Sequence, residues 1–199
     1  EILKYTKAIS MASRFTGVGS QVLVEYVQRM RQVGITVNGV ERNMVFMSEA
    51  MRKLGLDSDD LSKSLQSTSV SAFMLETIFK GPDQAIKYEQ LKLVMAGLAK
   101  QMGLATDVAD KFMNTLLDPI ERAKFSQFTG VAINSVDDMR KAMVKAGKQI
   151  APYVERLEQA REAGNADLSS ELQMEIQNLA NVYFGGSEAA LFMAANLEK

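Results

Sequence analysis

The stretch Phe15-Thr16-Gly17-Val18-Gly19-Ser20 contains the pattern that decides the fold: an apolar residue, a glycine, a second apolar residue and a small polar one. The pattern returns at residues 33–36, 54–58, 102–106 and 128–134. Glycine adopts the left-handed conformation just past a helix end, and the apolar residue after it packs back on the last turn. The polar residue then accepts hydrogen bonds from the free N–H groups of the next helix. Five such corners predict a chain of short helices, with each of these glycines within two residues of a helix end.

Apolar periodicity between the corners also predicts helices. Apolar residues recur at intervals of three and four, as in the series Val40, Met44, Met47, Met51 and Leu54. No run alternates apolar and polar residues with the β-branched enrichment of a strand. We therefore expect an all-α protein, an irregular multi-helix bundle of short helices joined by Gly-capped corners.

Several polar residues are typical of helix starts. Asn38 is expected to cap the helix that follows it, and Asp118 with Pro119 to begin another, with proline at the first helical position. Ser135 is expected to cap a helix that reaches roughly Ile150.

A change of character after residue 150 predicts two domains. The pair Ala151-Pro152 favours a helix end, because the residue before proline avoids the helical conformation. The segment beyond it is more charged. We expect a multi-helix domain over residues 1–150 and a helical hairpin plus a terminal helix over residues 151–199, packed less intimately with the rest.

The composition excludes many chemistries. The 199 residues include no His, no Cys and no Trp, so the chain cannot build a Ser-His-Asp triad, a thiol nucleophile, a zinc finger or a disulfide. Its 23 basic and 24 acidic residues give a net charge of −1, without the basic excess that normally accompanies DNA binding. We expect no catalysis, no cofactor, no metal and no sequence-specific nucleic acid partner.

Acidic pairs and glycine pairs are the remaining candidates for chemistry. Asp59/Asp60, Asp107/Asp110 and Asp137/Asp138 could hold a divalent cation, but each pair falls in the first turn of an expected helix, where acids favour the helix dipole. Gly17-Val18-Gly19 and Gly185-Gly186 lack the preceding strand and the following Gly-Lys-Ser/Thr of a phosphate loop. Capping and turn formation are therefore the favoured interpretations.

A modest basic face lies on the helix after Ser135. We expect it to be a solvated face that complements the dipole of a nearby helix end. Its members are Arg140, Lys141, Lys145 and Lys148.

The segment from Val70 to Phe79 has more apolar residues than one helix face can bury. Such a helix is either central in a core or buried against another chain. Both alternatives stay open from the sequence. If the second holds, the candidate interaction surface consists of Phe73, Met74, Ile78 and Phe79.

Methionine is abundant, with 13 residues, and lies mostly on the expected apolar faces. Filling the core is one interpretation. The other is an apolar groove rich in methionine, because thioether side chains suit surfaces that pack against several partners. The sequence thus also fits a soluble helical adaptor or regulatory domain that binds a partner helix.

The corners at residues 15–20, 54–61 and 128–139 resemble those of phage tail tape-measure proteins, whose short helices are separated by similar phrases. The resemblance covers roughly residues 10–145. It implies a structural virion protein that acts in tail assembly and length determination through helical packing with itself and with other tail proteins. It also implies location in the virion, whereas the adaptor alternative implies the cytoplasm.

Two further expectations concern the chain as a whole. It begins with Glu1 and not with methionine, which favours a processed product or a piece of a longer polypeptide. The longest apolar stretches are too short and too interrupted to span a bilayer, so we expect no stable membrane span. The expected partners are proteins.

Overall fold

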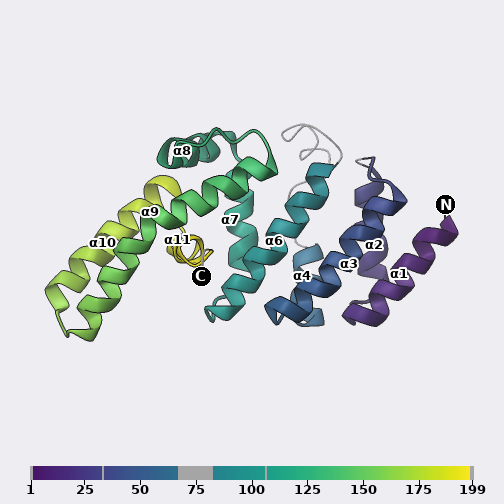
Figure 1. The fold of residues 1–199 in the computed structure, drawn as a ribbon, viewed down its shortest axis with the longest axis horizontal. Helices are drawn as coiled ribbons and strands as arrows, with labels where there is room; N and C mark the ends of the chain where they lie inside the picture. Colours follow the sequence, from purple (N-terminus) through teal and green to yellow (C-terminus); the bar gives the residue numbers. More distant parts are fainter. Residues whose placement is uncertain (1, 33, 67–82, 106, 198–199) are drawn as a thin grey trace. The chain divides into compact units, whose positions relative to one another are not determined.

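The computed structural model describes residues 2–32, 34–66, 83–105 and 107–197. Over these ranges the chain forms ten helices and no strand, which confirms the predicted all-α class (Figure 1). The chain divides into two compact units, Glu1–Asp110 and Lys111–Lys199. The division falls inside α7 (Asp107–Leu117).

The described residues of unit 1 form α1 (Ile2–Thr16), α2 (Ser20–Gln32), α3 (Val37–Leu54), α4 (Ser58–Gln66) and α6 (Asp83–Gln101). The helix α3 packs against both α1 and α6, while α2 contacts α1 and α4 (Figure 1). Burial of apolar side chains provides the main driving force for this packing. The interior holds large, fully buried side chains from several helices, among them Leu23, Met47, Leu61, Leu65 and Leu93.

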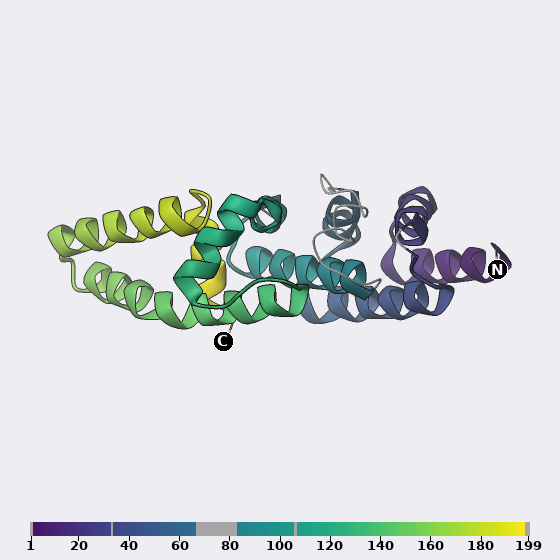
Figure 2. The same cartoon turned by 90° about the horizontal axis from the view of Figure 1, so that it is seen from above.

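Unit 2 is built around one long helix. Its helices besides α7 are α8 (Pro119–Thr129), α9 (Val136–Glu162), α10 (Ala166–Tyr183) and α11 (Glu188–Ala195). The helix α9 contacts α8, α10 and α11, and it forms a hairpin with α10 that both views show (Figures 1 and 2). Three aromatic rings, those of Phe112, Phe125 and Phe184, are buried together in this unit.

The predicted glycine corners are confirmed. Each of the five glycines lies within two residues of a helix end and has a φ between 64° and 79°. The residues are Gly17, Gly34, Gly55, Gly103 and Gly130.

Two of the predicted caps are confirmed and one is wrong. Asp118 and Ser135 cap α8 and α9 through their side-chain oxygens. The cap of α3 is Thr36, whose Oγ1 accepts a hydrogen bond from the Gly39 N–H at 3.3 Å, and Asn38 lies inside the first turn. Threonine and asparagine are both common N-cap residues, so the residue types alone could not decide between Thr36 and Asn38 as the start of α3.

The helix end predicted at Ala151-Pro152 is wrong. Pro152 lies inside α9, which continues to Glu162. An internal proline removes one backbone hydrogen bond and strains the helix. It is tolerated here because the buried stripe of α9 continues past it without a change of face: Met143, Ala146, Ile150, Val154, Leu157 and Ala160 are all buried at helical spacing.

The predicted boundary after residue 150 therefore lies within a helix, whereas the structure divides the chain after Asp110. The terminal helix also packs closely on the part of α9 that precedes Pro152. A Cβ placed on Gly147 would lie 2.2 Å from the carbonyl oxygen of Ala194, so α9 and α11 touch backbone to backbone. The helical hairpin predicted beyond residue 150 is present as α9 and α10, but it begins earlier in the chain.

Candidate functional site: a groove between α1 and α3

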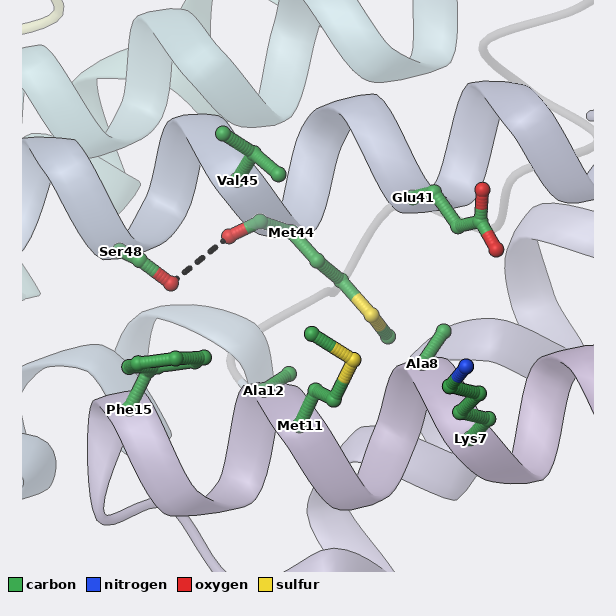
Figure 3. Close-up of a pocket in the computed structure, with 9 residues that line it drawn as sticks. All are labelled: Lys7, Ala8, Met11, Ala12, Phe15, Glu41, Met44, Val45 and Ser48. Carbon is green, nitrogen blue, oxygen red and sulfur yellow. Dashed lines mark hydrogen bonds between the residues drawn. The ribbon is translucent and has the colours of Figure 1, made fainter.

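An open apolar groove runs between α1 and α3 in unit 1 (Figure 3). It encloses about 350 Å³. Large apolar side chains on its rim stay in contact with solvent: Phe15 is 73% exposed, Val45 is 60% exposed and Met11 is 49% exposed. The other lining residues are Lys7, Ala8, Ala12, Glu41, Met44 and Ser48.

Small side chains at the floor of the groove keep it open. Ala8 and Ala12 come from α1, and Ser48 comes from α3. The Ser48 hydroxyl donates to the Met44 carbonyl oxygen at 3.0 Å, which directs it back to its own helix. These three small side chains leave part of the space between the two helices unfilled.

The groove has one charged end and one apolar end. Figure 3 shows Lys7 and Glu41 at one end, on opposite helices, and Phe15 and Ser48 at the other. Residue numbers rise along both helices in the same direction, so α1 and α3 run parallel along the groove. Both charged side chains are exposed.

The corner that ends α1 occurs a second time in the structure, at the end of α8. Residues 13–18 and 126–131 share the sequence Ser-x-Phe-Thr-Gly-Val. In the first copy the Ser13 hydroxyl donates to the Val18 carbonyl oxygen at 2.8 Å, and the Thr16 hydroxyl donates to the Ala12 carbonyl oxygen at 2.7 Å. The Thr16 hydroxyl also accepts from the Val18 N–H at 3.2 Å.

The second copy repeats each of these bonds. The Ser126 hydroxyl donates to the Val131 carbonyl oxygen at 2.6 Å, and the Thr129 hydroxyl donates to that of Phe125 at 3.0 Å. The Thr129 hydroxyl accepts from the Val131 N–H at 3.3 Å. The two corners are therefore the same local structure, placed in two units.

The surroundings of the two corners differ at the phenylalanine. In unit 2, Phe128 stacks on Tyr183 with ring centroids 4.6 Å apart, and it meets Phe184 edge to face at 5.9 Å. In unit 1 the matching ring, that of Phe15, is largely exposed on the groove. The position that precedes the corner threonine by four residues is Phe125 in unit 2 and Ala12 in unit 1. The groove thus lies beside a corner whose second copy packs its half-buried phenylalanine on two aromatic rings.

The residues proposed from the sequence as an interaction surface cannot be compared with this groove. Phe73, Met74, Ile78 and Phe79 lie outside the described residues, as does the whole apolar segment from Val70 to Phe79.

Part of the predicted methionine face reaches the groove. Of the series that includes Met44, Met47 and Met51, only Met44 lines the groove, and Met47 is fully buried in the core. The sequence reasoning did not identify Met11, Phe15 or Val45 as surface candidates. The motif Ser-x-Phe-Thr-Gly-Val, which the sequence contains twice, could have indicated Phe15 as a residue to compare with Phe128.

A buried polar cluster lies elsewhere in unit 1. Lys92 is 2% exposed, and its Nζ pairs with the Asp110 carboxylate at 2.8 Å and donates to the Ser64 carbonyl oxygen at 3.2 Å. Glu89, 3% exposed, lies close enough for the charges of Lys92 and Arg29 to act on it. Burial raises the pKa of the Glu89 carboxyl above its ordinary value, and those two cations oppose the rise. Burial also raises the pKa of Asp110, with Lys92 acting against it.

The acidic pairs lie where helix capping predicts them. Asp59 with Asp60, and Asp137 with Asp138, are in the first turns of α4 and α9. Asp107 and Asp110 begin α7. Among the described residues, no three acidic side chains gather in a way that could hold a metal ion.

The basic face lies in a different place from the one expected. Its residues belong to the first half of α9, because that helix does not end near residue 150. They are exposed there and lie far from the C-terminus of their own helix: Arg140, Lys141, Lys145 and Lys148. Lys145 is placed near the end of another helix, because its Nζ lies beside Gly130, the C-cap of α8.

No protein family model matches the chain, and neither does any curated protein or solved structure. Within the described part of the chain, every helix is too short or too polar to cross a membrane.

Proposed function

We propose that this chain is a structural helical protein that acts by binding other proteins, without chemistry of its own, in the tail of a phage particle. The observation that carries the proposal is the uncovered corner at Phe15 beside an open groove. A soluble protein gains free energy by removing such an apolar patch from water, at about 25 cal/mol for each Å². The tail setting is supported by the resemblance of the corners to those of tape-measure proteins.

The groove suits a helix as its occupant. It is bounded by two parallel helices, has an apolar floor and carries charges at one end. An amphipathic helix fits such a groove through side chains spaced at three and four residues. In a tail, this mode of contact would let the chain pack against itself and against tail proteins.

Particles that carry a Phe15→Ser variant of this chain test the proposal. We expect few tails or tails of altered length in negative-stain images, because the change removes the largest exposed apolar side chain of the groove. Ile120→Ser is the matched control, since Ile120 is 67% exposed but lies in unit 2. Circular dichroism should show that both variants keep their helices. Tails of normal length and full infectivity with Phe15→Ser would contradict the proposal.

The adaptor function is a second candidate, favoured by the two methionines, Met11 and Met44, that line the groove. Methionine adapts its shape to different apolar partners. An adaptor would bind one defined peptide as a monomer and would leave tail assembly unchanged. Normal tails with Phe15→Ser, combined with loss of binding to one peptide, would therefore favour the adaptor.

A further inference from the structure

We infer that the groove between α1 and α3 is the contact between two copies of this chain, related by a two-fold axis parallel to the groove. The inference rests on the proposed function, because it names a second copy as one partner of that same surface. Three features of the groove support it: the direction of its helices, the placement of its charges and its exposed aromatic ring.

The parallel helices allow such a symmetric pair. A two-fold axis along the groove places α1 of each copy over α3 of the other and keeps all four helices in one direction. Because the interface is isologous, each contact occurs twice. The charged end of one copy then faces the charged end of the other, and the apolar ends face each other in the same way.

The charges of the groove are complementary in this arrangement. Lys7 lies on α1 and Glu41 on α3, at the same end. Each Lys7 therefore faces the Glu41 of the other copy, which gives two attractive pairs. Two copies packed with the groove directions opposed would instead place Lys7 and Glu41 over the apolar end that contains Phe15. Charge placement thus selects the parallel arrangement.

The aromatic ring has a place in the same arrangement. Phe15 of each copy lies over the apolar end of the partner groove, near Val45 and Ser48 and next to the other Phe15. The second corner shows what covers this ring when the site is filled: Phe128 packs against Tyr183 at 4.6 Å. A pair of Phe15 rings would supply the aromatic contact that Tyr183 supplies in unit 2.

The size of the surface predicts a weak dimer. Two helices about 25 Å long with axes ~10 Å apart present a face of about 500 Å² on each copy. The pair would bury roughly 1,000 Å² in total, at the lower limit of specific interfaces. We expect a dissociation constant on the order of 10 µM, so dimers form at high protein concentration.

Exchange of the two charges tests the inference in the chain of residues 1–199, with sedimentation velocity as the measurement. Lys7→Glu alone and Glu41→Lys alone each place like charges opposite one another, and we expect each to weaken the dimer about tenfold or more. The double variant restores both attractive pairs and should dimerise like the natural chain. A mixture of the two single variants should form a heterodimer, because each contributes the charge that the other needs.

Two results would overturn the inference. One is a natural chain that stays monomeric at about 100 µM, well above the expected dissociation constant. The other is a dimer that the single charge changes leave unaffected and that the mixture does not favour. Neither result depends on tails: if the chain is monomeric and Phe15→Ser still disrupts tail assembly, this inference fails and the proposed function stands. If the chain dimerises and Phe15→Ser leaves tails normal, the proposed function fails instead.

Discussion

The same six-residue corner ends α1 in unit 1 and α8 in unit 2, yet the two copies meet different surroundings. Their internal hydrogen bonds match one for one, from the serine, the threonine and the residue after glycine. The phenylalanine is packed against Tyr183 in unit 2 and is 73% exposed in unit 1. The corner therefore fixes the turn of the chain, whereas its neighbours decide whether the aromatic ring is covered or left on the surface.

Loss of the side chain that precedes the corner should destabilise unit 2 most, because that side chain is Phe125. Phe125 is fully buried, with its ring 6.0 Å from that of Phe112 and 5.2 Å from that of Phe184. Phe125→Ala should lower the free energy of unfolding of unit 2 by about 3–5 kcal/mol, because it removes a core ring and leaves a cavity. Hydrogen exchange of the α8 and α9 amides measures the change. A loss below about 1 kcal/mol would mean that the aromatic cluster does not hold unit 2 together.

The corner hydroxyls should matter equally in both units. Thr16→Val and Thr129→Val each remove a buried hydroxyl that donates to the carbonyl four residues earlier and accepts from the N–H two residues later. The Thr129 hydroxyl also lies 3.5 Å from the Ser126 carbonyl oxygen. We expect each to cost about 1–2 kcal/mol of unfolding free energy, since an N–H that is buried at Val18 and partly buried at Val131 loses its acceptor. Hydrogen exchange in α2 and in α9 reports the two losses separately. If only one of the two variants lowered the unfolding free energy of its unit, the two corner threonines would not be equivalent, and this prediction would be wrong.

The corner glycines should differ slightly in what they tolerate. Both adopt a positive φ, 70° at Gly17 and 65° at Gly130, so alanine is strained by about 1 kcal/mol at either position. A Cβ on Gly17 would also lie 3.2 Å from the Ser58 Cβ, while a Cβ on Gly130 would meet only the Lys145 Nζ at 3.5 Å. Gly17→Ala should therefore lower the free energy of unfolding by about a few tenths of a kcal/mol more than Gly130→Ala does, because the added Cβ would be in tighter contact. Thermal unfolding of the two variants compares them, and the reverse order would contradict this account.

Much of the fold could be predicted because the corners carry local information. Gly17 and Gly130 have their conformations dictated by the residues beside them, and the sequence pattern identified both. Pro152 misled the prediction, because a local preference against helix was outweighed by a buried stripe that includes Ile150 and Val154. That stripe depends on contacts with α10 and α11, which the local sequence does not contain.

The candidate site was harder to predict for the same reason. Phe15 was visible in the sequence as part of a corner, but its exposure depends on small residues, Ala12 on its own helix and Ser48 on another. The pairing of α1 with α3 is a tertiary contact between helices that are separated by a third one. Of the residues that line the groove, Met44 alone belongs to the methionine series, Met44, Met47 and Met51, that the sequence indicates as a candidate apolar face.

The stability of unit 1 should depend slightly on pH in a way that the stability of unit 2 does not. The folded-state pKa of Glu89 and that of Asp110 are raised by burial in unit 1. A carboxyl with a raised pKa binds its proton more tightly in the folded state than in the unfolded state. These groups therefore make unit 1 less stable as the pH rises from their ordinary pKa to the raised pKa of the folded state. Glu89→Gln should reduce this dependence in α6 and leave α9 unchanged. Hydrogen exchange between weakly acidic and neutral pH provides the comparison, and an identical slope in the variant would contradict it.

Phe128 packs on aromatic rings of its own unit, whereas we infer that Phe15, in the other copy of the corner, faces a partner. Sedimentation velocity and unfolding of two matched variants, Phe15→Ala and Phe128→Ala, test this claim most directly. We predict that Phe15→Ala abolishes self-association and changes the unfolding free energy by less than about 0.5 kcal/mol. Phe128→Ala should lower the stability of unit 2 by about 1–3 kcal/mol and leave self-association intact. If Phe15→Ala destabilises its unit as much as Phe128→Ala does and the association of the chain is unaffected, the claim is wrong.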